Sequence, residues 1–184
     1  MNIAEHYLDE ARRGFRGHKR LAEGAMAQVS DQEFFAQLDP EANSIALVVK
    51  HMTGNMRSRW TDFLTSDGEK TDRKRDTEFE FDAQRDTRAD LMRRWEEMWE
   101  LVLDTVTALK PDDVLSTITI RGQDHTVLQA INRQLAHYAY HVGQIVLLAK
   151  HARGAQWKSL SIPRGQSETF GVQAQTEHRK RQES

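Results

Sequence analysis

Residues 127–149 read VLQAINRQLAHYAYHVGQIVLLA, and the spacing of apolar residues in this stretch decides the fold class. Apolar side chains recur every three or four positions, the period of one face of an α-helix. Thr126 and Gln129 have the spacing of an N-terminal capping box, and Gly154 is positioned to end a helix. We therefore predict a long amphipathic helix from about Thr126 to His151. Its apolar line is Val127, Ile131, Leu135, Tyr138, Val142, Ile145 and Ala149.

Three other stretches have the same helical period: residues 2–28, about 41–65 and about 83–109. Residues 66–82, SDGEKTDRKRDTEFEFD, are polar and dense in charge, and we expect this long connection to cross the end of the domain unburied. Residues 116–126 alternate β-branched side chains and predict a short extended or hairpin-like piece.

Four long helices with one long crossover predict an all-α protein, a four-helix bundle with inward-facing apolar stripes. Three prolines fall between the periodic segments, and no internal repeat is present. We predict a single domain over residues 1–170. Residues 171–184 are polar and are expected to form a mobile tail.

The composition of the chain limits the classes of function that are open to it. The 184 residues carry a net charge of -2, which argues against a nucleic-acid binder driven by a basic field. No apolar run approaches the ~20 residues of a membrane span, and residues 1–15, MNIAEHYLDEARRGF, have no apolar core, so we do not expect a signal peptide. We expect a cytoplasmic protein without a nucleic-acid or membrane partner. The chain has no cysteine, so a metal would need His, Asp or Glu, and thiol chemistry would need an external thiol.

Two histidines lie beside the apolar line of the last helix. Residues four positions apart advance about 400° around a helix, so His137 and His141 share a face. Two readings are open. Partly exposed imidazoles can bond to glutamines or water, or the pair can present two ring nitrogens to one divalent cation.

A third histidine, His51, lies at the edge of the apolar stripe of the second helix, between Val48 and Met52. A histidine in this position is commonly structural. If the second and fourth long helices are neighbours, however, three imidazoles could converge on one ion and leave coordination positions open. Open positions are typical of catalytic metal sites.

Four segments together carry a resemblance to a known family. They are KHMTGNMRSRWTDFL (50–64), DGEKTDRKRDTEFE (67–80), HTVLQAINRQLAHYAYHVGQI (125–145) and KHARGAQWKSLSIPRGQS (150–167). In these segments the chain resembles the DinB/YfiT-like superfamily of metalloenzymes, and an uncharacterised branch of it most closely. The resemblance extends from about residue 5 to residue 170.

The resemblance implies a DinB-like four-helix bundle of up-down-down-up topology. It also implies a divalent metal held by His51, His137 and His141, with zinc or nickel as the ion that suits a nitrogen-rich site. Similar proteins transfer low-molecular-weight thiols such as bacillithiol, or use mycothiol, and often form homodimers. A small-molecule substrate and a thiol co-substrate are therefore expected.

The other polar residues have competing interpretations. Asn55, Gln134 and Gln144 could fix ligand tautomers or could be ordinary polar residues at the edge of a stripe. His18 could be a fourth ligand or a substrate contact, although a helix-packing or surface role is the favoured interpretation, and His125 is expected to act locally. The remaining histidines are expected to face solvent or lie near a terminus: His6, His151 and His178.

The tryptophans and the charged runs have structural readings of their own. Trp60, Trp95 and Trp99 are expected in the core or at a dimer interface. Residues 57–59 and 72–76 could contact an anionic substrate or a partner subunit, but a solvated, mutually paired run is the simpler interpretation. The basic tail at 178–182 is too short to argue for nucleic acid.

Three functions remain open at this point. The leading hypothesis is a metal-dependent transferase that joins a low-molecular-weight thiol to an electrophile. The second is metal-assisted hydrolysis, which the lack of an acidic general base on the ligand stripe disfavours. The third is a non-catalytic stress protein in which the metal serves stability or sensing.

Overall fold

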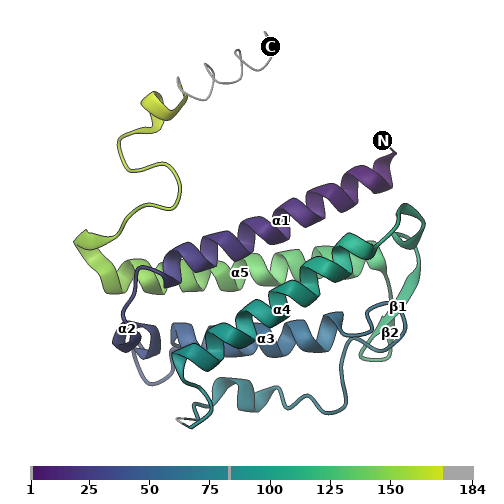
Figure 1. The fold of residues 1–184 in the computed structure, drawn as a ribbon, viewed down its shortest axis with the longest axis horizontal. Coiled ribbons are helices and arrows are strands. Elements are labelled where there is room, and N and C mark those ends of the chain that lie inside the picture. The colour runs from purple at the N-terminus through teal and green to yellow at the C-terminus, as the bar shows by residue number, and fades with distance from the viewer. Residues whose placement is uncertain (1, 83, 172–184) are drawn as a thin grey trace.

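Four long helices follow the four periodic stretches of the sequence (Figure 1). The structure, a computed structural model, describes residues 2–82 and 84–171. The long helices are α1 (Ile3–Met26), α3 (Ile45–Trp60), α4 (Arg88–Ala108) and α5 (Val127–Arg153). Each begins after a residue whose side chain accepts a hydrogen bond from a backbone N–H in the first turn, which stabilises the helix start. These capping residues are Asn2, Ser44, Thr87 and Thr126.

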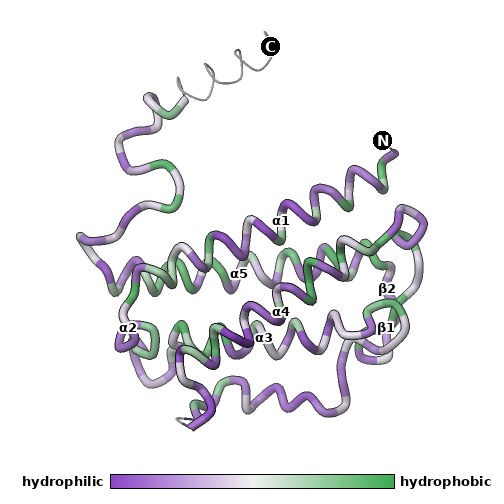
Figure 2. The backbone as a smooth tube through the Cα atoms, viewed as in Figure 1, coloured by the Kyte–Doolittle hydropathy of each residue, from purple (hydrophilic) through white to green (hydrophobic). Residues whose placement is uncertain are grey.

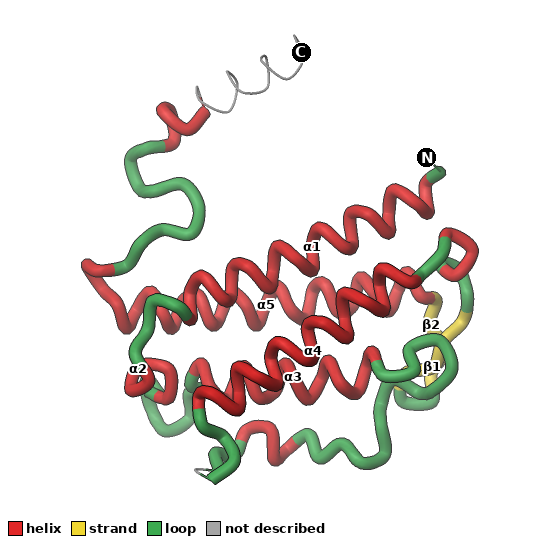
Figure 3. Tube along the Cα trace, in the orientation of Figure 1, coloured by secondary structure: helices red, strands yellow, loops and turns green. Residues whose placement is uncertain are grey.

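The prediction of a mostly helical protein is confirmed, with one small addition of strand (Figure 3). Strands β1 (Thr117–Ile120) and β2 (Gln123–Thr126) pair antiparallel in the predicted extended segment. The short helices are α2 (Asp31–Phe35), η1 (Asp76–Phe79), η2 (Pro111–Asp113) and η3 (Gly154–Gln156).

Helices α3 and α5 end for different local reasons. The predicted second helix stops at Trp60 rather than near residue 65, because Thr61 is extended and Asp62 has φ 49°, outside the helical region. Helix α5 ends where predicted, at Gly154, whose φ of 51° glycine adopts without a side-chain clash.

The long helices lie side by side and run in two directions. In Figure 1, α1 and α5 run from right to left, whereas α3 and α4 run from left to right. Helix α1 contacts α4 and α5, and α3 also contacts both of these helices. Two parallel neighbours, α3 and α4, need a long connection to return the chain to the starting end.

Aromatic residues fill the space between the helices. Trp60, Trp95 and Trp99 are almost completely buried, which confirms their prediction as core residues. Phe15 meets Trp60 edge to face at 5.4 Å between ring centroids. The Trp60 indole Nε1 donates a hydrogen bond of 2.9 Å to the hydroxyl of Tyr138, which links α3 to α5 inside the core.

The connection between α3 and α4 runs back beneath α3 in Figure 1 and is largely hydrophilic in Figure 2. The prediction that it lies unburied is wrong for two of its charged side chains. Arg73 and Glu78 are 3% and 9% exposed. Burial is tolerated because each charge is paired with the other. The interpretation as a solvated run holds for Arg57 and Asp72, an exposed ion pair.

The C-terminal segment is described only in part. Residues 167–171 form a helical turn. The predicted mobile tail, 171–184, lies outside the described residues from position 172 onward. No helix in the described ranges is both long and apolar enough to cross a membrane.

Candidate metal centre

Three histidines from two helices meet where α3 packs against α5. His51 lies on α3, and His137 and His141 lie one turn apart on α5. The Nε2 atoms of His51 and His137 are 3.4 Å apart, and those of His137 and His141 are 3.1 Å apart. One ring nitrogen of each residue lies within 4.8 Å of those of the other two.

These separations fit a shared cation. Imidazole nitrogens bind zinc at about 2.0–2.1 Å, so two such ligands on a tetrahedral ion lie roughly 3.3 Å apart. The His51–His137 and His137–His141 Nε2 separations are within a few tenths of an ångström of that value. The residues present therefore fit a divalent metal without large rearrangement.

Hydrogen bonds at the far side of two rings fix their tautomers. The Nδ1–H of His51 donates to Glu78 Oε2 at 2.9 Å, and that of His141 donates to Gln144 Oε1 at 2.8 Å. The Nε2 lone pairs of both rings are consequently free on the side where the histidines meet. Each of these lone pairs lies 3.1 or 3.4 Å from the Nε2 atom of His137, a contact that is favourable only with a proton or a cation between the two nitrogens. Such outer partners are usual for metal-binding histidines.

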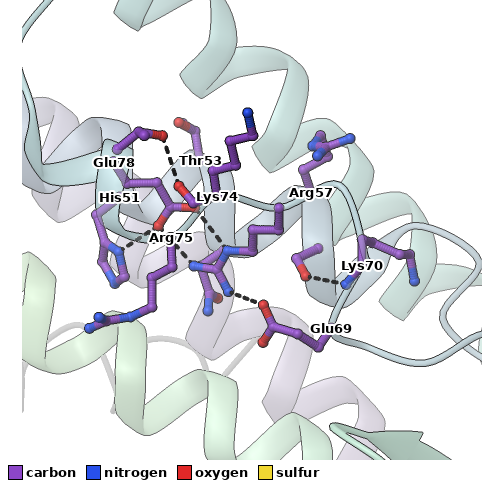
Figure 4. A network of polar contacts seen from close by, with 12 residues as sticks. His51, Thr53, Arg57, Glu69, Lys70, Lys74, Arg75 and Glu78 are labelled. Carbon is purple, nitrogen blue, oxygen red and sulfur yellow. Dashed lines mark hydrogen bonds and ion pairs between the residues drawn. The ribbon is translucent and has the colours of Figure 1, made fainter.

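The Glu78 carboxylate is itself held in place (Figure 4). It accepts hydrogen bonds from Arg73 Nε at 2.8 Å and Arg73 Nη2 at 2.9 Å in addition to the bond from His51. Burial alone would raise the pKa of Glu78, but the hydrogen bonds from His51 and Arg73 outweigh it and lower the pKa. Glu78 is therefore an ionised acceptor that orients His51.

The two histidines of α5 are in the form that binds metal. Burial, together with the nearby histidines and Arg59 and Arg73, lowers the pKa of His137 to about 3, and burial is the main cause that lowers the pKa of His141 to about 4. Both imidazoles are neutral near pH 7, and neutral imidazole is the ligand form.

The histidines form one wall of a cavity of about 330 Å³. Phe79 stacks on His51 with 4.7 Å between ring centroids, and Tyr140 lies 4.1 Å from the His141 ring. Both aromatic residues line the cavity together with the three histidines, so a small molecule bound there would lie against imidazole and aromatic rings.

The other polar residues fall into separate groups. Gln144 fixes the tautomer of His141, as one of the two interpretations predicted. Gln134 and Asn55 bond to each other instead: Gln134 Nε2 donates to Asn55 Oδ1 at 2.6 Å, and neither bonds to the three histidines. His18 and His125 are not part of the three-histidine group. His6 and His151 are exposed as predicted, and His178 lies outside the described residues.

Sequence reasoning missed Glu78 and Arg73. Both belong to a run of charges that is indistinguishable by composition from a solvated loop. The available signal is indirect: a metal-binding histidine commonly has a carboxylate partner, and the polar connection after α3 supplies several.

A family model described as protein of unknown function (DUF1572) matches residues 2–166. No curated protein and no solved structure matches the chain.

Proposed function

The chain belongs to the DUF1572 family, and we propose that it is a divalent-metal-dependent enzyme whose ion is held by His51, His137 and His141. The observation that carries the proposal is that the Nε2 atom of His137 lies 3.4 Å from that of His51 and 3.1 Å from that of His141, at the wall of a cavity. Three protein ligands leave room for a reactant, as in catalytic rather than structural zinc sites.

The proposal includes a DinB-like four-helix bundle of up-down-down-up order. The opposite directions of the α1–α5 and α3–α4 pairs support it, as does the long connection between the two parallel helices. This arrangement sets α3 against α5, which is what the proposed ligand set requires.

The reaction we propose is transfer of a low-molecular-weight thiol to an electrophile. When bound, zinc or nickel would lower the pKa of a coordinated thiol and supply the nucleophile that a cysteine-free chain lacks. The chain's own groups then have defined tasks. Glu78 and Gln144 keep two Nε2 atoms unprotonated, and Phe79 and Tyr140 shape the space beside them.

Hydrolysis is less well supported by the cavity. Among the described residues that line it, none is an aspartate or a glutamate. Glu78 is close, but its carboxylate is occupied by Arg73 and His51. A thiol needs no general base beyond the ion, whereas activation of water usually benefits from one.

Activity should depend on both metal and thiol. Zinc- or nickel-loaded protein, given cysteine or 2-mercaptoethanol and an aryl halide, is expected to form the thioether above the uncatalysed rate. The C–S bond forms as the carbon–halogen bond breaks, halide leaves and the thiol proton passes to solvent. Absorbance of the product measures the rate, and chelated protein should match the blank.

The outcomes separate the three hypotheses. Turnover of activated esters without thiol would support hydrolysis instead. Tight metal binding with a raised melting temperature, but no turnover on thiol and ester panels, would leave a non-catalytic metal-binding stress protein. Full activity after removal of the metal would overturn the proposal.

A substitution at Gly54 tests whether Glu78 supports metal binding through its hydrogen bond to His51, and it does so without altering any charge. A Cβ at this position would lie 2.3 Å from Glu78 Oε1, so Gly54→Ala must displace the carboxylate that orients His51. We expect zinc affinity, measured by calorimetry, to fall about 10- to 100-fold, the usual effect of losing such a partner.

Gly143→Ala is the matched control for Gly54→Ala. Gly143 is also helical and lies two residues from His141, but a Cβ there meets nothing within 4 Å. This variant should retain zinc affinity and gain about 1 kcal/mol of stability, because alanine favours helix over glycine. Equal affinity in both variants would show that Glu78 does not act through His51.

A further inference from the structure

The cavity beside the histidines is lined by five arginines. They come from α3, from the connection after it, from the β1–β2 turn and from α5: Arg59, Arg73, Arg75, Arg121 and Arg133. No carboxylate belongs to the described lining. A small cavity with several convergent guanidinium groups has the donors and the charge that an anion requires.

Two of these arginines, Arg59 and Arg73, are buried and paired with protein carboxylates. Arg59 Nη2 donates to Glu69 Oε2 at 2.9 Å, and Arg73 binds both Glu78 and, at 3.5 Å, Glu69. Both side chains are buried. They form the inner part of the positive wall, and their charges are largely balanced locally.

The other three, Arg75, Arg121 and Arg133, are named here the rim arginines. Arg133 lies one helical turn before His137 and has no ion pair within the described part of the chain. Arg75 lies over the Phe79 ring at 5.2 Å and is 3.8 Å from the exposed carboxylate of Asp76. Arg121 shares Glu69 with Arg59 and is 53% exposed. The five lining arginines thus form ion pairs with three carboxylates, Glu69, Glu78 and Asp76, so guanidinium groups outnumber the carboxylates that pair with them.

The backbone at Arg121 adds an independent observation. Arg121 and Gly122 have φ of 56° and 70°, a hairpin turn in which asparagine or glycine is preferred at the first position. Arginine in this left-handed region costs stability. Both backbone N–H groups of the turn donate to Asp67, at 2.9 and 2.8 Å, which holds it in place. Strain of this kind is commonly retained at functional sites.

We propose that the rim arginines bind a carboxylate or phosphate group of the small-molecule substrate, or of its thiol co-substrate, beside the histidine cluster. The inference rests on the proposed function for what happens at the histidines. Anion binding by the arginines themselves does not require the metal. The cavity of about 330 Å³ limits the ligand to a small molecule.

The test compares charged and neutral probes. Calorimetry at fixed ionic strength measures succinate, inorganic phosphate and the neutral diamide of succinate against metal-free and zinc-loaded protein. Succinate or phosphate should bind at least tenfold tighter than the diamide, and preference between the two anions distinguishes a carboxylate from a phosphate ligand. Comparable binding of all three probes would overturn the inference.

Substitutions of the rim arginines test whether the anion binds at them. Arg133→Gln and Arg121→Asn should each weaken the preferred anion roughly tenfold, the usual consequence of losing one charged hydrogen-bond donor. Arg121→Asn should at the same time preserve or raise the melting temperature, because asparagine suits the turn better. Arg93→Gln, at an exposed pair on α4 outside the cavity, is the control and should change nothing.

The two proposals fail in different ways. Zinc binding through the histidines with no preference for anions would remove the rim site and leave the metal enzyme. Anion binding that depends on Arg121 and Arg133 in a protein that binds no zinc would keep the rim site and remove the proposed function. Unchanged anion affinity in both arginine variants would place the anion elsewhere and overturn the inference.

Discussion

Replacing His137 or His141 by alanine is expected to abolish specific zinc or nickel binding. The two Nε2 atoms lie 3.1 Å apart, and that of His137 lies 3.4 Å from that of His51; alanine offers no replacement ligand. The loss of affinity should exceed about 100-fold, the upper end of the effect of losing an outer hydrogen-bond partner. Titration calorimetry of metal-free protein and metal analysis after dialysis measure it.

Thermal unfolding gives a second readout of the same prediction. Metal at 100 times its dissociation constant stabilises a folded protein by about 2.7 kcal/mol. For a chain of this size, that raises the melting temperature by roughly 5–10 °C. The wild-type protein should show this shift and both variants should lack it.

His151→Ala controls for the removal of an imidazole from the same helix, because His151 is exposed and lies on α5 outside the cavity. It should bind metal as the wild type does. Wild-type affinity in both His137→Ala and His141→Ala would refute the proposed centre.

Asp86→Asn is expected to lower the free energy of unfolding by about 2–3 kcal/mol, the usual cost of losing hydrogen bonds to a buried charged group. The Asp86 side chain is 2% exposed and accepts bonds of 2.7 Å from Lys50 Nζ on α3 and Arg94 Nη2 on α4. Removing the buried carboxylate leaves Lys50 and Arg94, whose side chains are 17% and 31% exposed, without their charge partner. Chemical denaturation monitored by tryptophan fluorescence measures the free energy of unfolding.

The effect of Asp86→Asn should depend on pH in a defined direction. Burial alone would raise the pKa of Asp86, but the hydrogen bonds from Lys50 and Arg94 outweigh it and lower the pKa. The ionised group therefore stabilises the folded protein above its unfolded pKa of about 3.9. That contribution is lost as the pH falls through the folded pKa, so the difference between wild type and variant should shrink below about pH 4.

An exposed pair on the same helix is the control for Asp86. Glu97 accepts from Arg93 at 2.8 Å, and the two side chains are 51% and 60% exposed. Glu97→Gln should cost at most about 1 kcal/mol. If Asp86→Asn and Glu97→Gln lower the free energy of unfolding equally, the inference that Asp86 stabilises the packing of α3 against α4 is wrong.

Local signals were enough to predict the helices. The apolar line of α5, its capping residue Thr126 and its end at Gly154 all act within a few residues of the backbone they stabilise. The same is true of the alternating residues that form β1 and β2. The prediction of an unburied connection was wrong for Arg73 and Glu78, because a run of charges in the sequence does not show which side chains pair with one another and become buried.

The sequence by itself determined the helical class, the helix limits to within a few residues, and the shared face of His137 and His141, because helical period is a local property. Only the tertiary structure decided that His51, 86 residues earlier in the chain than His137, lies 3.4 Å from it. It also decided that Glu78 orients His51 and that five arginines line the same cavity. These facts follow from how α3 and its returning connection pack against α5, which depends on the whole core and on no single local pattern.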